Sequence, residues 1–141
     1  MPDSKDGLSD LTKNRFMSFA FGMLQNHPYQ KELQYLHAAV LVRGGSILSR
    51  GFNKPKRNMF VDTYRHHEGC NIHAEVSAIL NCRKKIDLRG SKLYVARARR
   101  LDGESANSKP CSSCQVILRR YGIKKVFYSL EGGKYKMMKV N

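Results

Sequence analysis

The sequence predicts an α/β fold in which helices flank a five-stranded mixed sheet. Five short runs rich in β-branched and aromatic residues are typical of strands, and three longer runs with apolar residues at helical spacing are typical of helices. The two kinds of run are interleaved along the chain, as in α/β domains. Only residues 130–134 separate the last two strands. A parallel connection needs about a dozen residues, so the last strand is expected to run antiparallel to its neighbour.

The 141 residues are expected to form a single domain, spanning residues 1–141, with one core of moderate size. Residues 1–7 are polar and are expected to be disordered. No apolar run approaches the roughly 20 residues that cross a membrane, so no membrane partner is expected. The N-terminus lacks the charged-then-apolar pattern of a signal peptide, which favours a cytoplasmic location and leaves export by another route open.

The first helix is expected to begin at Ser9 or Asp10, either of which can cap it, and to end near Asn26, before Pro28. It should cover one face of the sheet, because its apolar residues recur at roughly helical spacing. These residues are Leu11, Phe16, Phe19, Ala20, Met23 and Leu24.

Residues 37–42 and 46–51 read as two strands of a hairpin, since Gly44 and Gly45 between them suit a two-residue turn. The returning strand leads directly into Asn53. An asparagine in this place has either a local backbone role in the turn or a role in contacting a ligand.

The segment from residue 54 to residue 71 is long for a loop in a compact domain, which favours a functional role. It combines cations, which can meet phosphates, with aromatic rings, which can stack on bases, so it is a candidate nucleic-acid contact. The residues concerned are Lys54, Lys56, Arg57, Arg65, His66 and His67, with Phe52, Phe60 and Tyr64.

A second helix is expected to open at His73 and Glu75, which begin an apolar run of helical spacing. Residues 92–97 read as the next strand. Arg99 and Arg100 follow it and are further candidates for nucleic-acid contact, and the polar loop 101–109 after them is a candidate wall of the site.

A third helix is expected to open at residues 110–114 and to end at Gly122, with Pro110 at its first helical position. Both Cys111 and Cys114 would then lie at a helix N-terminus, which favours the thiolate form. Residues 125–129 and 135–140 read as the last two strands.

His73, Cys111 and Cys114 together offer three ligands for one zinc ion per chain and leave one tetrahedral position open, as a catalytic zinc requires. A lone Cys-x-x-Cys pair is also found in redox and structural zinc sites. Cys82 reads as a buried thiol. A second metal site built from His66, His67 and Cys70 is conceivable, but no fourth ligand is evident.

The pattern His73-x-Glu75 with Pro110-Cys111-x-x-Cys114 resembles the zinc-dependent cytidine deaminase superfamily, over about residues 36–129. The resemblance implies a three-layer cytidine deaminase-like fold and hydrolytic removal of an exocyclic amine from a base, with Glu75 moving the protons. It also implies that Asn53, the backbone of Ala74 and Lys109 contact the substrate. Lys109 departs from the small or acidic residue that relatives often carry there.

The net charge of +15 indicates a polyanionic partner, although a basic surface without that role remains an alternative. Nucleic acid, with DNA favoured over RNA, is therefore the expected substrate. The alternatives are free cytosine nucleotides or nucleosides (dCMP or cytidine), adenosine in tRNA, and a catalytically silent zinc domain that binds nucleic acid. Intact Glu75 argues against the silent domain.

The antiparallel last strand resembles free-nucleoside cytidine deaminases and bacterial toxin-type DNA deaminases. It departs from the helix-connected arrangement of deoxycytidylate deaminases, tRNA adenosine deaminases and vertebrate mutator deaminases. The sequence leaves the oligomeric state open.

Overall fold

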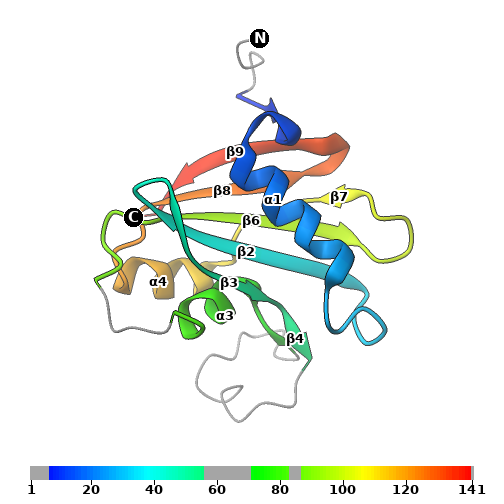
Figure 1. Ribbon diagram of the computed structural model, residues 1–141, viewed down its shortest axis with the longest axis horizontal. Coiled ribbons are helices and arrows are strands. Elements are labelled where there is room, and N and C mark those ends of the chain that lie inside the picture. Colours follow the sequence, from blue (N-terminus) through cyan, green and yellow to red (C-terminus); the bar gives the residue numbers. More distant parts are fainter. Residues whose placement is uncertain (1–6, 56–70, 83–86, 141) are drawn as a thin grey trace.

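A seven-stranded mixed sheet forms the middle layer of the protein (Figure 1). The computed structural model describes residues 7–55, 71–82 and 87–140, and the structural statements below concern these residues. The strand order is β1-β9-β8-β6-β2-β3, and β7 pairs with β6 beside this path. The strands are β1 (Ser9–Asp10), β2 (Tyr35–Arg43), β3 (Ser46–Phe52), β6 (Lys92–Arg99), β7 (Ser105–Ala106), β8 (Lys125–Leu130) and β9 (Lys134–Lys139).

The three-layer mixed architecture expected from the sequence is confirmed, and all five expected strands are present as β2, β3, β6, β8 and β9. Two further strands, β1 and β7, have only two residues each and therefore carry little sequence pattern. A separate pair, β4 (Lys54–Pro55) with β5 (Asn71–Ile72), brackets the long loop. None of the helices in the described part of the chain has the length and apolarity of a membrane crossing.

The last two strands run antiparallel, as their short connection predicted. The chain turns between β8 and β9 through a short 3-10 helix, η3 (Glu131–Gly133). β8 itself runs parallel to β6, and α4 (Ser112–Arg120) lies in the crossover between them.

The expected single helix over residues 9–26 is wrong in detail. The segment instead forms η1 (Leu11–Lys13), α1 (Arg15–Met23) and η2 (Leu24–Asn26). Asp10 caps only η1, and the Asn14 side chain caps α1 by accepting hydrogen bonds from the backbone N–H groups of Phe16 and Met17. The Asn14 cap therefore divides the expected helix into separate segments.

Side chains alternate between the two faces of β2 and β6, and this alternation separates two cores. Even-numbered residues, such as Val40 and Ala96, pack under α1. Odd-numbered residues, such as Leu41 and Val95, pack under α3 (Ala74–Leu80) and α4. Figure 1 shows α1 lying across the strands, with α3 and α4 together apart from it. Each face therefore has a helical layer of its own.

Three glycines hold the β2–β3 hairpin in place. The turn residues Gly44 and Gly45 have φ of +60° and +78°, as the expected two-residue turn requires. Gly51 lies against α3, where a Cβ atom would come within 2.3 Å of the Ala78 backbone nitrogen. The absence of a side chain at Gly51 therefore lets α3 approach the sheet closely.

Candidate active site

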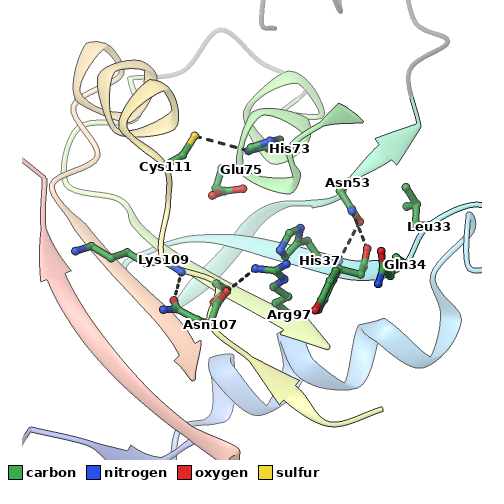
Figure 2. A pocket seen from close by; sticks show the side chains of 12 residues that line it. Leu33, Gln34, His37, Asn53, His73, Glu75, Arg97, Asn107, Lys109 and Cys111 are labelled. Carbon is green, nitrogen blue, oxygen red and sulfur yellow. Dashed lines mark hydrogen bonds between the residues drawn. The ribbon is translucent and has the colours of Figure 1, made fainter. Parts of the chain in front are cut away.

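A cavity of about 370 Å³ opens beside the first residues of α3 and α4 (Figure 2). It receives side chains from β2, β6, the end of β3 and the segment before α4, which lie far apart in the sequence. The lining residues are Leu33, Gln34, Tyr35, His37, Asn53, His73, Glu75, Arg97, Asn107, Ser108, Lys109 and Cys111.

At one side of this cavity, the ligand atoms of His73, Cys111 and Cys114 lie within 4.8 Å of one another. The His73 Nδ1 is 3.4 Å from the Cys114 Sγ and 3.9 Å from the Cys111 Sγ. In a tetrahedral zinc site with ordinary bond lengths, nitrogen and sulfur ligands are about 3.6 Å apart. The three donors therefore fit one zinc ion and leave a coordination position for water or substrate.

The starts of the two helices explain how these ligands meet. His73 is the N-cap of α3, and Cys111 is the N-cap of α4, whose Sγ accepts a hydrogen bond from the Cys114 backbone N–H at 3.5 Å. Pro110 consequently precedes the cap and is not the first helical residue, so that part of the prediction is wrong. The spacing Cys-x-x-Cys puts one sulfur at the cap and the other one turn into the helix.

Glu75 lies next to the three ligands but is not one of them. Its side chain is buried, with 5% of its surface exposed. Burial raises the pKa of the Glu75 carboxyl above its usual value, against the opposing effect of the His73 imidazole. Figure 2 shows Glu75 between the His73–Cys111 side of the cavity and the His37–Arg97 side. The Glu75 carboxyl therefore lies between the candidate zinc ligands and the rest of the cavity.

His37 and Arg97 form the floor of the cavity opposite these ligands. They are paired across β2 and β6 and lie on the odd-numbered face of the sheet, beside the first residues of α3 and α4. Burial, together with the adjacent Arg97 guanidinium, lowers the pKa of His37 to about 3, so its imidazole is neutral.

Asn53 lines the cavity, but its amide is already engaged with the protein. Its Oδ1 accepts a hydrogen bond from the His37 backbone N–H at 2.9 Å and lies 2.6 Å from the His27 Nε2, while its Nδ2 donates to the Tyr35 carbonyl. His27 Nε2 must be the donor, because its Nδ1 accepts from the Tyr29 backbone N–H. Asn53 thus ties the start of β2 to the end of β3.

Ala74 and Lys109 occupy different surroundings. Ala74, the first residue of α3, is fully buried and is not among the residues that line the cavity. The Lys109 backbone N–H donates to the Asn107 Oδ1 at 2.9 Å, and the Lys109 side chain is exposed and points away from Arg97 in Figure 2.

The proposed nucleic-acid contacts are only partly visible. Lys54 lies in β4, directly after the cavity residue Asn53. Arg99 forms an ion pair with Asp102, and the Arg100 guanidinium donates to the carbonyls of Gln30 and Lys31. The other four cations, Lys56, Arg57, Arg65 and His67, lie outside the described residues, as do His66 and Cys70 of the conceivable second metal site.

The motif did not reveal His37, Arg97 or Tyr35 as cavity residues. The signal that could have found His37 and Arg97 is their phase, because each lies on its strand two residues from a buried apolar residue of the odd-numbered face, Ala39 or Val95. A polar residue that follows buried apolar residues on the same face of a strand indicates where the hydrophobic core ends and a functional site begins.

A layered α/β domain that brings an imidazole and two thiols together beside a buried carboxyl is the arrangement of zinc-dependent nucleobase deaminases. The chain belongs to the family described as the cytidine and deoxycytidylate deaminase zinc-binding region, whose model matches residues 11–130. It is thus an enzyme of the cytidine deaminase type with one zinc ion per chain. Comparison with curated proteins gave no match.

Several solved structures share the fold. The dCMP deaminase of cyanophage S-TIM5, in complex with dCMP and dUMP, is 24% identical with a TM-score of 0.56, over 85% of this chain and 82% of the other. A cytidine deaminase from Burkholderia pseudomallei is 16% identical with a TM-score of 0.60, over 89% and 91% of the two chains. A tRNA:A34 deaminase is 20% identical with a TM-score of 0.50, over 83% and 75%.

Proposed function

We propose that the protein deaminates cytosine to uracil by hydrolysis and acts on cytosine in nucleic acid, with DNA favoured over RNA. The observation that carries the reaction is the buried Glu75 carboxyl beside the His73, Cys111 and Cys114 donors. The preference for a polymer is supported by the net charge of +15.

In the proposed mechanism His73, Cys111 and Cys114 hold the zinc ion. Bound zinc supplies the acidity that brings water within reach of deprotonation near neutral pH. Glu75 would take one proton from that water and donate it to the ring nitrogen as the water oxygen adds to C4 of cytosine. It would then take the proton of the new hydroxyl and pass it to the amine as the C4–N bond breaks, which gives uracil and ammonia.

The rest of the cavity serves to hold the base. We assign the Asn53 Nδ2–H and the backbone of Ala74 and Lys109 to substrate contacts. Asn53 and Lys109 line the cavity, and Ala74 stands in the chain between the cavity residues His73 and Glu75. Neutral His37, on the floor, can both donate and accept a hydrogen bond, which suits the edge of a neutral base. Lys54, Lys56, Arg57, Arg65, His67, Arg99 and Arg100 are the cations assigned to a nucleic-acid backbone.

A second candidate is deamination of free cytosine nucleotides or nucleosides. It is favoured by the fold likeness to the cyanophage dCMP deaminase and the Burkholderia cytidine deaminase, and by ion pairing of Arg99 within the chain. The tRNA:A34 deaminase shares the fold too, so adenine in tRNA belongs in the same test.

The deciding experiment incubates the zinc-loaded protein with dCMP, cytidine, single-stranded DNA, duplex DNA, RNA and a tRNA, and measures the products by mass spectrometry. Uracil appearing fastest in DNA supports the proposal. Faster conversion of dCMP or cytidine supports the second candidate, and inosine in tRNA supports deamination of adenine in tRNA. Glu75→Gln serves as the control for contaminating activity.

A further inference from the structure

We propose that Arg97 binds a phosphate group of the substrate, either the 5′-phosphate of a nucleotide or a phosphodiester next to the target cytosine. The proposal rests on the proposed function, because it concerns the same cavity. Arg97 belongs to neither of the two sequence motifs that carry the zinc ligands and Glu75.

The Arg97 guanidinium is held in a fixed position. Its Nη1 donates a hydrogen bond to the Asn107 carbonyl at 3.0 Å, and its central carbon lies 3.9 Å from the centre of the Tyr35 ring. A stacked and hydrogen-bonded guanidinium loses little further conformational entropy when an anion binds. Figure 2 shows Arg97 between Asn107 and His37, across the cavity from His73 and Cys111.

Arg97 forms no ion pair with a carboxylate among the described residues, although Glu104 and Glu131 line the adjoining hollow with it. The ion pairs found there join Arg89 to Asp87 and Arg99 to Asp102. The Arg97 Nε is buried and has no hydrogen-bond partner in the described part of the chain. A guanidinium that is partly buried with a donor unused favours an anionic ligand.

The other cavity groups make phosphate the fitting anion. A cytosine base is neutral, so a cytosine nucleotide carries its negative charge on phosphate alone. The neighbouring His37 is neutral, so it neither attracts the phosphate as a second cation nor competes with the phosphate for Arg97 as an anion would. Arginine matches a phosphate with two parallel N–H donors, which gives both strength and orientation.

The position of Arg97 also suits a substrate that continues past the cavity. Arg97 lines both the cavity of about 370 Å³ and an adjoining hollow of about 290 Å³. The two hollows share Tyr35, Arg97 and Asn107. A phosphate bound at Arg97 would therefore lie at the junction, where a nucleotide ends or a polymer chain continues.

The test compares kcat/KM for deoxycytidine, dCMP and a single-stranded oligodeoxynucleotide with one cytosine. A fourth substrate is the same oligonucleotide with an uncharged methylphosphonate linkage 5′ to that cytosine. Arg97→Gln should lower kcat/KM roughly 10- to 100-fold on the substrates that carry the phosphate, the loss typical of a hydrogen bond between charged groups. It should change the value less than about twofold on deoxycytidine and on the methylphosphonate.

Two variants control this comparison. Arg120→Gln removes the same charge from an exposed residue at the far end of α4 and should leave all four values unchanged. Arg97→Lys keeps the charge without the planar fork and should fall between wild type and Arg97→Gln. If Arg97→Gln loses zinc or unfolds, Arg97→Lys takes its place in the comparison of the four substrates.

A loss confined to dCMP identifies a phosphomonoester, and a loss confined to the unmodified oligonucleotide identifies a phosphodiester. Equal losses on phosphate-bearing and phosphate-free substrates, or no loss on any, overturn the proposal. Calorimetric binding of dCMP and deoxycytidine to Glu75→Gln protein tests the same site without turnover. If wild type deaminates no cytosine substrate, the proposed function fails, and the phosphate site is then tested by binding alone. It fails if Arg97→Gln weakens the binding of neither dCMP nor the unmodified oligonucleotide relative to deoxycytidine and the methylphosphonate.

Discussion

At the scale of the single residue, the site places a buried carboxyl beside the three metal donors. The donors of the metal are one imidazole and two sulfurs, and Glu75 lies beside them without sharing that role. The carboxyl is buried among neighbours whose positions are set by the helix starts. A change at Glu75 can therefore alter chemistry while leaving the metal in place.

Glu75→Gln should retain zinc and the thermal unfolding midpoint but lower kcat by at least about 10²-fold, since an amide cannot accept and return the proton. Zinc content by atomic absorption and kcat on the best substrate of the panel check this. Near-normal turnover in a zinc-replete variant would falsify the assigned role.

The candidate zinc ligands and Glu75 could be proposed from the sequence because they belong to two short motifs, and the structure brings these residues together. Sequence reasoning did not identify His37 and Arg97, which are separated by 60 positions and become neighbours only through the β2–β6 register. Strand alternation predicts that side chains face two sides, but it does not predict which side will carry the zinc helices. The floor of the site therefore required the three-dimensional structure.

At the scale of the secondary-structure element, α3 and α4 each contribute ligands from their first turn. Replacing Cys114 by Ser should lower zinc affinity and the unfolding midpoint together, because the metal links the two helices. Zinc titration and thermal unfolding of the variant measure both effects. Cys82→Ser is the matched control and should keep a full complement of zinc, since Cys82 lies outside the donor group. Unchanged zinc affinity in Cys114→Ser would remove Cys114 from the ligands.

The packing of α3 on β3 depends on Gly51. Gly51→Ala should destabilise the fold by about 3 kcal/mol, because its methyl group would clash with the backbone of α3 rather than with a movable side chain. Gly22→Ala is the control, since Gly22 lies within α1 with nothing within 4 Å of the added carbon, and it should be stabilising by up to about 1 kcal/mol. Urea unfolding of both variants checks the two signs, and equal effects would contradict this account of the packing.

The elements themselves were largely predictable from local pattern. The hairpin at Gly44 and Gly45 and the antiparallel last strand followed from turn chemistry and connection length. The break in the first helix was not predicted, because Asn14 is an unremarkable polar residue until its side chain is seen to cap α1. Short strands such as β1 and β7 depend on pairing with distant partners and have no local signal of their own.

At the scale of the whole molecule, the net charge of +15 predicts how activity responds to salt. If the substrate is a polymer held at about six phosphates, its affinity should fall on the order of 10³-fold or more between 50 and 200 mM salt, because each contact releases counterions. KM for an oligonucleotide measured across this range checks the slope, and deoxycytidine serves as the uncharged control. A flat response for the oligonucleotide would show that the charge does not serve binding.

The register of β2 on β6 has a consequence for how mutations affect this enzyme. Because the odd-numbered side chains make both the core under the zinc helices and the cavity floor, a one-residue shift of either strand would turn its odd-numbered side chains toward α1 and separate His37 from Arg97. A misregistered molecule would thus be unstable and inactive at once, not a stable enzyme with altered chemistry. Substitutions in the opposite core, under α1, should accordingly change how many molecules are active and leave the turnover of each active molecule the same.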